Sequence, residues 1–223
     1  MIMKMKITKS ILVTLALIGF STQSCKDYLD EKLVSAVSAG SYYTTAAGLE
    51  DAVDATYSFL REIYSNERAY MLSIFGTDTH TNGADGGYKG FNFYDNTLNS
   101  GVDILLQQWE FLYKGINQAN AVLNRSEAVE GVTDAVKLQR QAEVRFLRAF
   151  YYFYLVQTWG DVHFTLDETI GAQVTANKTS QATIYSEGII PDLNLQLRIC
   201  QLHKATMAGQ LRQRLSFYWR KLI

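Results

Sequence analysis

The chain has few of the residues that build rigid turns, disulfide frameworks and catalytic centres. Its 223 residues include one proline, two cysteines and three histidines. A single proline is typical of a mainly helical chain with few rigid turns. Cys25 and Cys200 occur in unlike contexts, so we predict neither a disulfide nor a Cys-rich metal site. His80, His163 and His203 lie far apart in the sequence, and we therefore expect no enzyme.

The chain also has no marked excess of positive or negative charge, because its formal net charge is −1. This balance argues against nucleic acid, which binds strongly basic surfaces. No Walker motif or G-x-S-x-G elbow is present. Residues 78–83 weakly resemble a calcium loop, but Lys89 stands where an EF-hand needs a bidentate glutamate. We therefore predict no metal and no cofactor.

The first residues have the pattern of a secretion signal. Lys4, Lys6 and Lys9 precede an apolar run from residue 11 to residue 20, which is too short to cross a bilayer. Small and polar residues then lead into Cys25, as in a loose lipobox. We expect residues 1–24 to be a lipoprotein signal peptide and Cys25 to be the site of lipid attachment. The alternative is plain secretion with Cys25 as a spare thiol.

Apolar residues recur at helical spacing in three segments of the remaining chain. The spacing predicts helices over residues 49–64, 102–123 and 134–159, with Asp134 as the N-cap and Gly160 as the stop of the last one. Residues 161–180 lack this period and are expected to form a loop or short strand before a further helix near Ser180 or Thr183. Trp109 and Trp159 are predicted to be core residues.

A glycine-rich segment, residues 76–101, interrupts the helices. Long loops in compact domains are often functional, and this one combines aromatic rings with amides and carboxylates, the mixture that binds sugar rings and hydroxyls. Phe91 and Phe93 alternatively anchor the loop to the core. The candidate ligand residues are Asp78, Asn82, Tyr88, Phe91, Phe93 and Tyr94.

Several polar residues at helical spacing are expected to form hydrogen bonds or ion pairs that stabilise the fold. Asn117, Asn120 and Asn124 form a ladder, and because Asn is a poor helix former we expect hydrogen bonds to a neighbouring backbone turn. Arg145 and Arg148 are expected to form ion pairs, with Glu143, Glu110 or Glu127 as candidate partners.

Two segments carry a family resemblance. The run from Gln108 to Asn120, QWEFLYKGINQAN, and the run from Ala142 to Tyr152, AEVRFLRAFYY, followed by Trp159-Gly160-Asp161-Val162, resemble the signature helices of the SusD/RagB family. The lipobox followed by Tyr28-Leu29-Asp30 and the segment 183–194 are also similar to the family. One departure is His163-Phe164, where the family usually has a proline.

The resemblance implies a mainly α fold of tetratricopeptide-like helix pairs with long irregular loops. It further implies a nutrient-binding outer-membrane lipoprotein on the cell exterior that takes oligosaccharides and partners a SusC-like TonB-dependent transporter. The alternatives are a helical protein–protein scaffold without ligand binding and a non-functional truncated fragment.

The last residues differ in character from the rest. No acidic residue occurs from Leu195 to Ile223. Back-translation in the frame that starts at each codon's third base permits strings similar to the family's continuation, such as FAIANLP across Asn194 to Gln201. We therefore expect a signal peptide over 1–24, a SusD-like N-terminal helical domain over 25–194 and an out-of-frame tail over 195–223. The alternative is a genuine, divergent basic tail.

Overall fold

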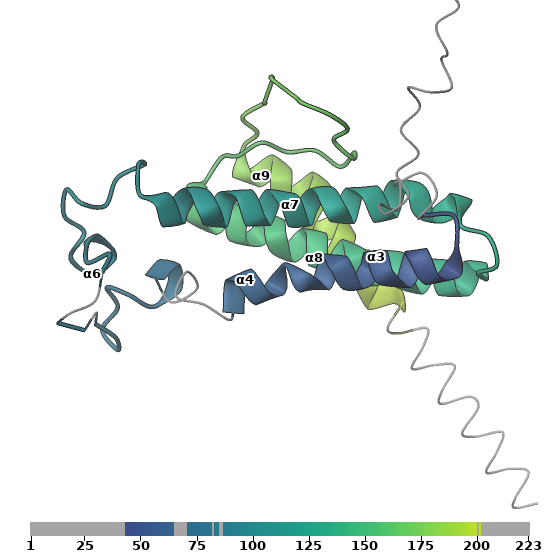
Figure 1. The fold of residues 1–223 in the computed structure, drawn as a ribbon, viewed down its shortest axis with the longest axis horizontal. Helices are drawn as coiled ribbons and strands as arrows, with labels where there is room; N and C mark the ends of the chain where they lie inside the picture. Colours follow the sequence, from purple (N-terminus) through teal and green to yellow (C-terminus); the bar gives the residue numbers. More distant parts are fainter. Residues whose placement is uncertain (1–42, 65–70, 82, 85–86, 200, 202–223) are drawn as a thin grey trace, which may run out of the picture. The chain divides into compact units, whose positions relative to one another are not determined.

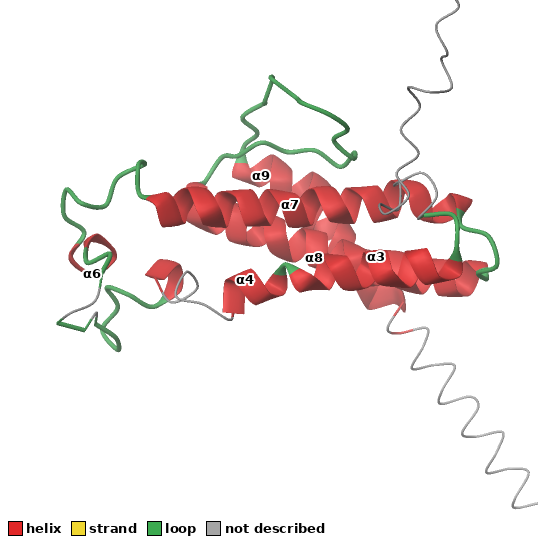
Figure 2. Ribbon diagram, in the orientation of Figure 1, coloured by secondary structure: helices red, strands yellow, loops and turns green. Residues whose placement is uncertain are grey.

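The structure is a computed structural model that describes residues 43–64, 71–81, 83–84, 87–199 and 201. The chain divides into two units, residues 1–38 and 39–223, and all described residues belong to the second. The expected signal peptide, Cys25 and residues 202–223 lie outside the described residues. Within those ranges the chain is helix and loop (Figure 2), with one isolated antiparallel bridge between Val162 and Thr179.

Two long helices form the centre of the unit, and they confirm the predicted mainly α fold. Helices α7 and α8 pack along each other, and α3 contacts both (Figure 1). Short helical elements extend this group; η3 is a π-helical segment, and the chain continues helical to residue 199. The elements are α3 (Ala46–Ser58), α4 (Leu60–Tyr64), α6 (Gly90–Phe93), α7 (Asp103–Arg125), η2 (Ser126–Ala128), α8 (Asp134–Trp159), α9 (Gln181–Ile184) and η3 (Tyr185–Ile189).

Helix α8 begins and ends at capping residues that suit its polarity. The Thr133 side chain accepts a hydrogen bond from the Val136 N–H at 3.4 Å, so Thr133 is the N-cap rather than the predicted Asp134. Asp134 occupies the first turn instead, where the positive end of the helix dipole stabilises its carboxylate. Gly160 ends the helix as predicted, with a φ of 77° that favours glycine.

The first predicted helix, residues 49–64, is two helices in the structure. The Thr45 side chain caps α3 by accepting a hydrogen bond from the Gly48 N–H at 3.1 Å, and the helix therefore starts before Leu49. Phe59 separates α3 from α4. The apolar period continues through this break, which explains why periodicity alone did not show it.

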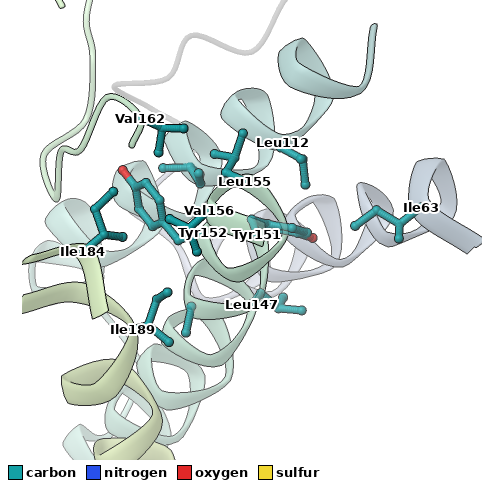
Figure 3. Close-up of a cluster of buried hydrophobic side chains, with 12 residues drawn as sticks. Ile63, Leu112, Leu147, Tyr151, Tyr152, Leu155, Val156, Val162, Ile184 and Ile189 are labelled. Carbon is teal, nitrogen blue, oxygen red and sulfur yellow. The ribbon is translucent and has the colours of Figure 1, made fainter. Parts of the chain in front are cut away.

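The main core cluster lies where α8 meets its neighbours (Figure 3). Tyr151 and Tyr152 are fully buried at its centre, and their hydroxyls donate to the carbonyls of Thr56 at 2.6 Å and Thr165 at 2.7 Å. Gly115 of α7 permits the close packing, because a Cβ there would sit 2.9 Å from the Tyr151 ring. Trp109 and Trp159 pack against this cluster half-buried, with centroids 5.3 Å apart.

A buried charge network joins α8 to the helical segment after η3, and it corrects the expected partners of Arg145 and Arg148. Arg148 donates to both carboxylate oxygens of Asp192 at 2.8 and 2.9 Å. Arg145 adds a contact to Asp192 at 3.0 Å. The Arg148 and Asp192 side chains are only 4% and 3% exposed. A buried guanidinium needs such a paired carboxylate to offset its loss of hydration.

The asparagine ladder fastens the loop after α8, as predicted. Asn117 accepts from the Thr169 N–H at 2.7 Å and donates to the Thr169 carbonyl at 3.4 Å. Asn120 donates to the carbonyls of Thr165 and Asp167 and accepts from Arg148 at 2.8 Å. Asn124, the third predicted member, is exposed. Two asparagines therefore hold residues 165–169 against α7.

Candidate functional site

The predicted ligand loop is anchored by its own small core. Met71, Phe91 and Ile104 form a buried cluster that ties the segment from 71 onward to the start of α7. Phe91, on the single turn α6, is only 7% exposed. Its side chain is therefore mostly packed inside the protein, in keeping with the alternative that Phe91 anchors the loop to the core.

Two tyrosines of this loop have unusual backbone conformations. Tyr88 has a φ of 54° and Tyr94 a φ of 53°, and they are the non-glycine residues with positive φ in the described part of the chain. This conformation costs about 1–2 kcal/mol for a residue with a side chain. Strain of this kind persists where the surroundings enforce it, and it concentrates at binding sites. Both residues are among the predicted ligand residues.

The surroundings of Tyr94 enforce its position. Its N–H donates to the Gly90 carbonyl at 2.8 Å as the cap of α6. Its ring passes so close to Gly76 that a Cβ there would sit 2.6 Å from the hydroxyl oxygen. The side chain nevertheless remains 68% exposed. Tyr94 is thus a fixed ring with an accessible surface.

Short polar turns fix the chain that follows Tyr94. The Asp95 carboxylate accepts hydrogen bonds from the N–H of Thr97 at 2.9 Å and from its hydroxyl. These bonds lower the pKa of Asp95 below its ordinary value, because they favour the charged form. Asn99 accepts similarly from the Gly101 N–H at 2.9 Å. The loop therefore carries an ionised, exposed carboxylate at the residue that follows Tyr94.

Tyr94 lines a cavity of about 730 Å³ together with the end of α8. Aromatic rings from two segments meet there, Phe75 from the loop and Tyr154 and Trp159 from α8. Gln157 contributes an amide whose NH₂ donates to the Tyr185 hydroxyl at 2.8 Å. Clefts of this size with aromatic walls and a few polar groups are typical of small-ligand sites.

Tyr88 belongs to a different cavity, of about 530 Å³, beside the start of α7. Its hydroxyl donates to Asp103 at 3.4 Å, and the neighbouring Lys89 ammonium donates to the Ala84 carbonyl at 2.5 Å. The buried Phe91 lines both cavities. The loop thus presents its two strained tyrosines to two separate hollows.

The remaining predicted residues are scattered. Phe93 is 63% exposed, and Asp78 is also exposed, but neither lines these cavities. Asn82 lies outside the described residues. The sequence interpretation did not include Trp159, Tyr154 and Gln157 among the ligand residues. Its assignment of Trp159 to the core agrees with the packing of this half-buried ring against the main core cluster, but the same ring also lines the cavity beside Tyr94. The available signal was the position of Trp159 at the last residue of α8.

The described residues contain no group of three His, Cys, Asp or Glu side chains arranged to hold a metal ion. None of their helices combines the length and apolar character needed to cross a membrane. Burial raises the pKa of Tyr152 to about 12 and the pKa of Tyr113 further above its ordinary value. These phenols therefore remain protonated at neutral pH.

The sequence profile of a SusD-like family, described as starch-binding and associating with the outer membrane, matches residues 27–203. A SusD-like protein, P25, of Formosa agariphila is 27% identical over 199 residues, covering 84% of this chain and 36% of the relative. A SusD-like protein of Bacteroides ovatus is 27% identical over 157 residues, covering 69% and 28%. The chain thus spans about a third of the length of these relatives.

Solved structures share the helical arrangement. A laminarin-binding SusD-like protein superposes with a TM-score of 0.61 at 24% identity, covering 70% of this chain and 34% of the other. NanU of B. fragilis gives a TM-score of 0.58 at 23% identity, covering 74% and 33%. At this level of identity the likeness concerns the fold.

Proposed function

The chain belongs to the SusD-like family of glycan-binding proteins that associate with the outer membrane, and from this premise we propose that it binds an oligosaccharide at the hollow beneath Tyr94. The single observation that supports this site is Tyr94 itself. It is held in a left-handed conformation, lies 68% exposed, and borders a cavity with Trp159 and Tyr154.

The chemistry of this hollow suits a sugar. The C–H faces of a sugar ring stack on aromatic rings, and hydroxyls bond to amides and carboxylates. Tyr94, Phe75 and Trp159 supply rings, while the Gln157 amide and the hydroxyls of Ser73 and Thr158 supply polar atoms. Because the Tyr94 ring is already fixed against Gly76, little ordering is needed when a ligand binds. Tyr88 and Asp103 offer a smaller, second surface of the same loop.

We also propose where the protein acts and which protein receives its ligand. A lipid on Cys25 would hold the protein at the outer membrane, facing the cell exterior, and a SusC-like TonB-dependent transporter would receive the glycan. Two or more acyl chains give stable anchoring, whereas one chain is marginal. We assign no catalytic residue, and the protein acts as a binding partner rather than an enzyme.

A protein–protein scaffold without ligand binding is the second candidate. Phe146 of α8 favours it, because it is 43% exposed and does not line the hollow beneath Tyr94, and exposed aromatic residues are common at protein interfaces. The two candidates differ in what Tyr94 does, since a scaffold has no need of an exposed ring on strained backbone.

A glycan array separates these candidates. The full chain is applied to neutral and acidic plant, algal and host glycans beside Tyr94→Ala, with Phe146→Ala as the matched aromatic control. Binding by the parent chain and Phe146→Ala, but not by Tyr94→Ala, is the expected result. A blank array for a correctly folded parent chain would favour the scaffold.

A further inference from the structure

We infer that the chain has a second carbohydrate site, in a cavity of about 620 Å³ between the middle of α7 and the loop 161–171. None of its lining residues belongs to the segment 71–101, so the site is distinct from the hollow beneath Tyr94. The choice of ligand class rests on the proposed glycan-binding function, whereas the existence of the site rests on its own geometry.

Aromatic rings form one side of this cavity. Trp109 and Tyr113 stand one helical turn apart on α7, with ring centroids 4.9 Å apart and planes inclined at 50°. The His163 ring follows at 6.2 Å from Tyr113. Three neighbouring rings that border a cavity make the kind of apolar wall on which sugar rings stack. Trp109 is only half-buried, which leaves part of its ring accessible.

The loop 161–171, which carries His163 and forms the other part of the cavity lining, is held in place before any ligand arrives. Tyr113 donates to the His163 carbonyl at 2.7 Å, and Asn117 exchanges two hydrogen bonds with Thr169. Arg125 clamps Glu168 with two bonds of 2.7 and 2.8 Å. Side chains of α7 therefore bond several backbone groups of the loop, and a fixed wall loses little conformational freedom on binding.

Polar groups suited to hydroxyls remain at the cavity. Glu110 and Lys114 form an ion pair of 3.4 Å whose side chains are 50% and 58% exposed. Such a pair is worth at most about 1 kcal/mol, so either group can turn to a ligand at small cost. Nδ1 of His163 lies 2.7 Å from the Asn177 side-chain oxygen, while no described residue hydrogen-bonds its Nε2.

The balance of these charges selects the ligand. One carboxylate and one ammonium neutralise each other at the rim, and no further charged side chain lines the cavity within the described residues. An acidic glycan would be attracted by Lys114 but repelled by Glu110. Uncharged sugar hydroxyls can instead donate to the Glu110 carboxylate and accept from the Lys114 ammonium. The cavity therefore suits a neutral sugar.

The indole resonances of Trp109 and Trp159, each assigned through its Trp→Phe variant, follow ligand binding in nuclear magnetic resonance spectra of the full chain. Trp109 lines this cavity and Trp159 lines the hollow beneath Tyr94. Because the two rings lie 5.3 Å apart and sense each other's surroundings, variants at each cavity assign a shift to its site. The probes are maltohexaose, a starch fragment, and laminarihexaose, a laminarin fragment. We expect one of them to shift the Trp109 signal saturably, both in the parent chain and in Tyr94→Ala.

Removing the rim groups with Glu110→Ala and Lys114→Ala together should weaken this response roughly tenfold, because about two modest hydrogen bonds are lost. Leu106→Ala, an exposed change on the same helix outside the cavity, should leave it unchanged. A Trp109 signal that ignores both probes, that vanishes in Tyr94→Ala, or that is unaffected by the rim double variant would overturn the second site. Shifts of both tryptophans that Tyr94→Ala leaves unchanged and the rim double variant weakens would instead refute only the loop site.

Discussion

Replacing Asp192 by asparagine removes one charge from the buried network and leaves its shape nearly unchanged. Asp192 accepts from Arg148 at 2.8 and 2.9 Å and from Arg145 at 3.0 Å. Arg145 is 35% exposed and can reach water, but Arg148 is 4% exposed and cannot. The substitution therefore strands one guanidinium inside the protein. Its remaining bonds, to Asn120 and to the Leu166 carbonyl, carry no compensating charge.

The magnitude follows from this burial. Breaking a buried ion pair by removing one partner costs about 3–5 kcal/mol. For a protein of this size each kcal/mol lowers the unfolding temperature by about 2–4 °C, so Asp192→Asn should lower it by about 6–20 °C. The exposed pair of Glu110 and Lys114 provides the matched control, since Glu110→Gln should cost at most about 1 kcal/mol.

Urea unfolding of the full chain, followed by circular dichroism, measures both free energies of unfolding. The double variant Arg148→Met with Asp192→Leu should recover part of the loss, because it removes the stranded charge. If Asp192→Asn costs no more than Glu110→Gln, the network contributes no more than a surface pair and the reasoning from burial is wrong.

Three further changes test other contacts. Gly188→Ala should cost about 1–3 kcal/mol, because the added Cβ would meet the Phe164 ring at 2.6 Å, whereas Gly87→Ala, with open space around it, should be nearly neutral in the same urea assay. Burial raises the pKa of Tyr152 to about 12 from 10.0, so its contribution to stability is full below pH 10 and is lost as the pH rises through 12, a decline of about 3 kcal/mol. Burial raises the pKa values of Tyr113 and Tyr151 as well, so in unfolding at stepped pH Tyr152→Phe should make the decline about 3 kcal/mol smaller without abolishing it. Tyr94→Gly should leave stability unchanged or raise it by about 1 kcal/mol, because the left-handed backbone is no longer strained, while glycan binding is lost; a destabilised variant would contradict the strain argument.

Local rules in the sequence predicted much of the helical frame. The spacing of apolar residues located α7 and α8, Gly160 marked the end of α8, and the poor helix propensity of Asn117 and Asn120 indicated their bonds to a backbone turn. These features depend on residues close together in the chain or on a single helix face. The break at Phe59 was missed because both helices continue one apolar stripe.

Long-range partners were beyond the same rules. Arg148 finds Asp192, 44 residues away, only because η3 and the following helical segment pack on α8. Sequence proximity favoured Glu143, which instead pairs with Arg140 at 3.0 Å. The π-helical turn at Tyr185–Ile189, packed so that Gly188 abuts Phe164, likewise has no local signature.

In the candidate site, too, the sequence predicted local features but not long-range contacts. Composition drew attention to Tyr88 and Tyr94, but it could not separate the buried Phe91 from the exposed rings. Nor could it place Trp159 and Tyr94 around one cavity, because the two residues are far apart in the sequence and only the tertiary fold brings them to the same cavity.

The most direct test is the dissociation constant of the full chain for the best glycan of the array, measured by isothermal titration beside Tyr94→Gly. The account predicts at least tenfold weaker binding with an unchanged unfolding temperature, because a ring is lost and a strained backbone is relaxed. Equal affinity of the two proteins would contradict the proposal that Tyr94 forms the glycan site.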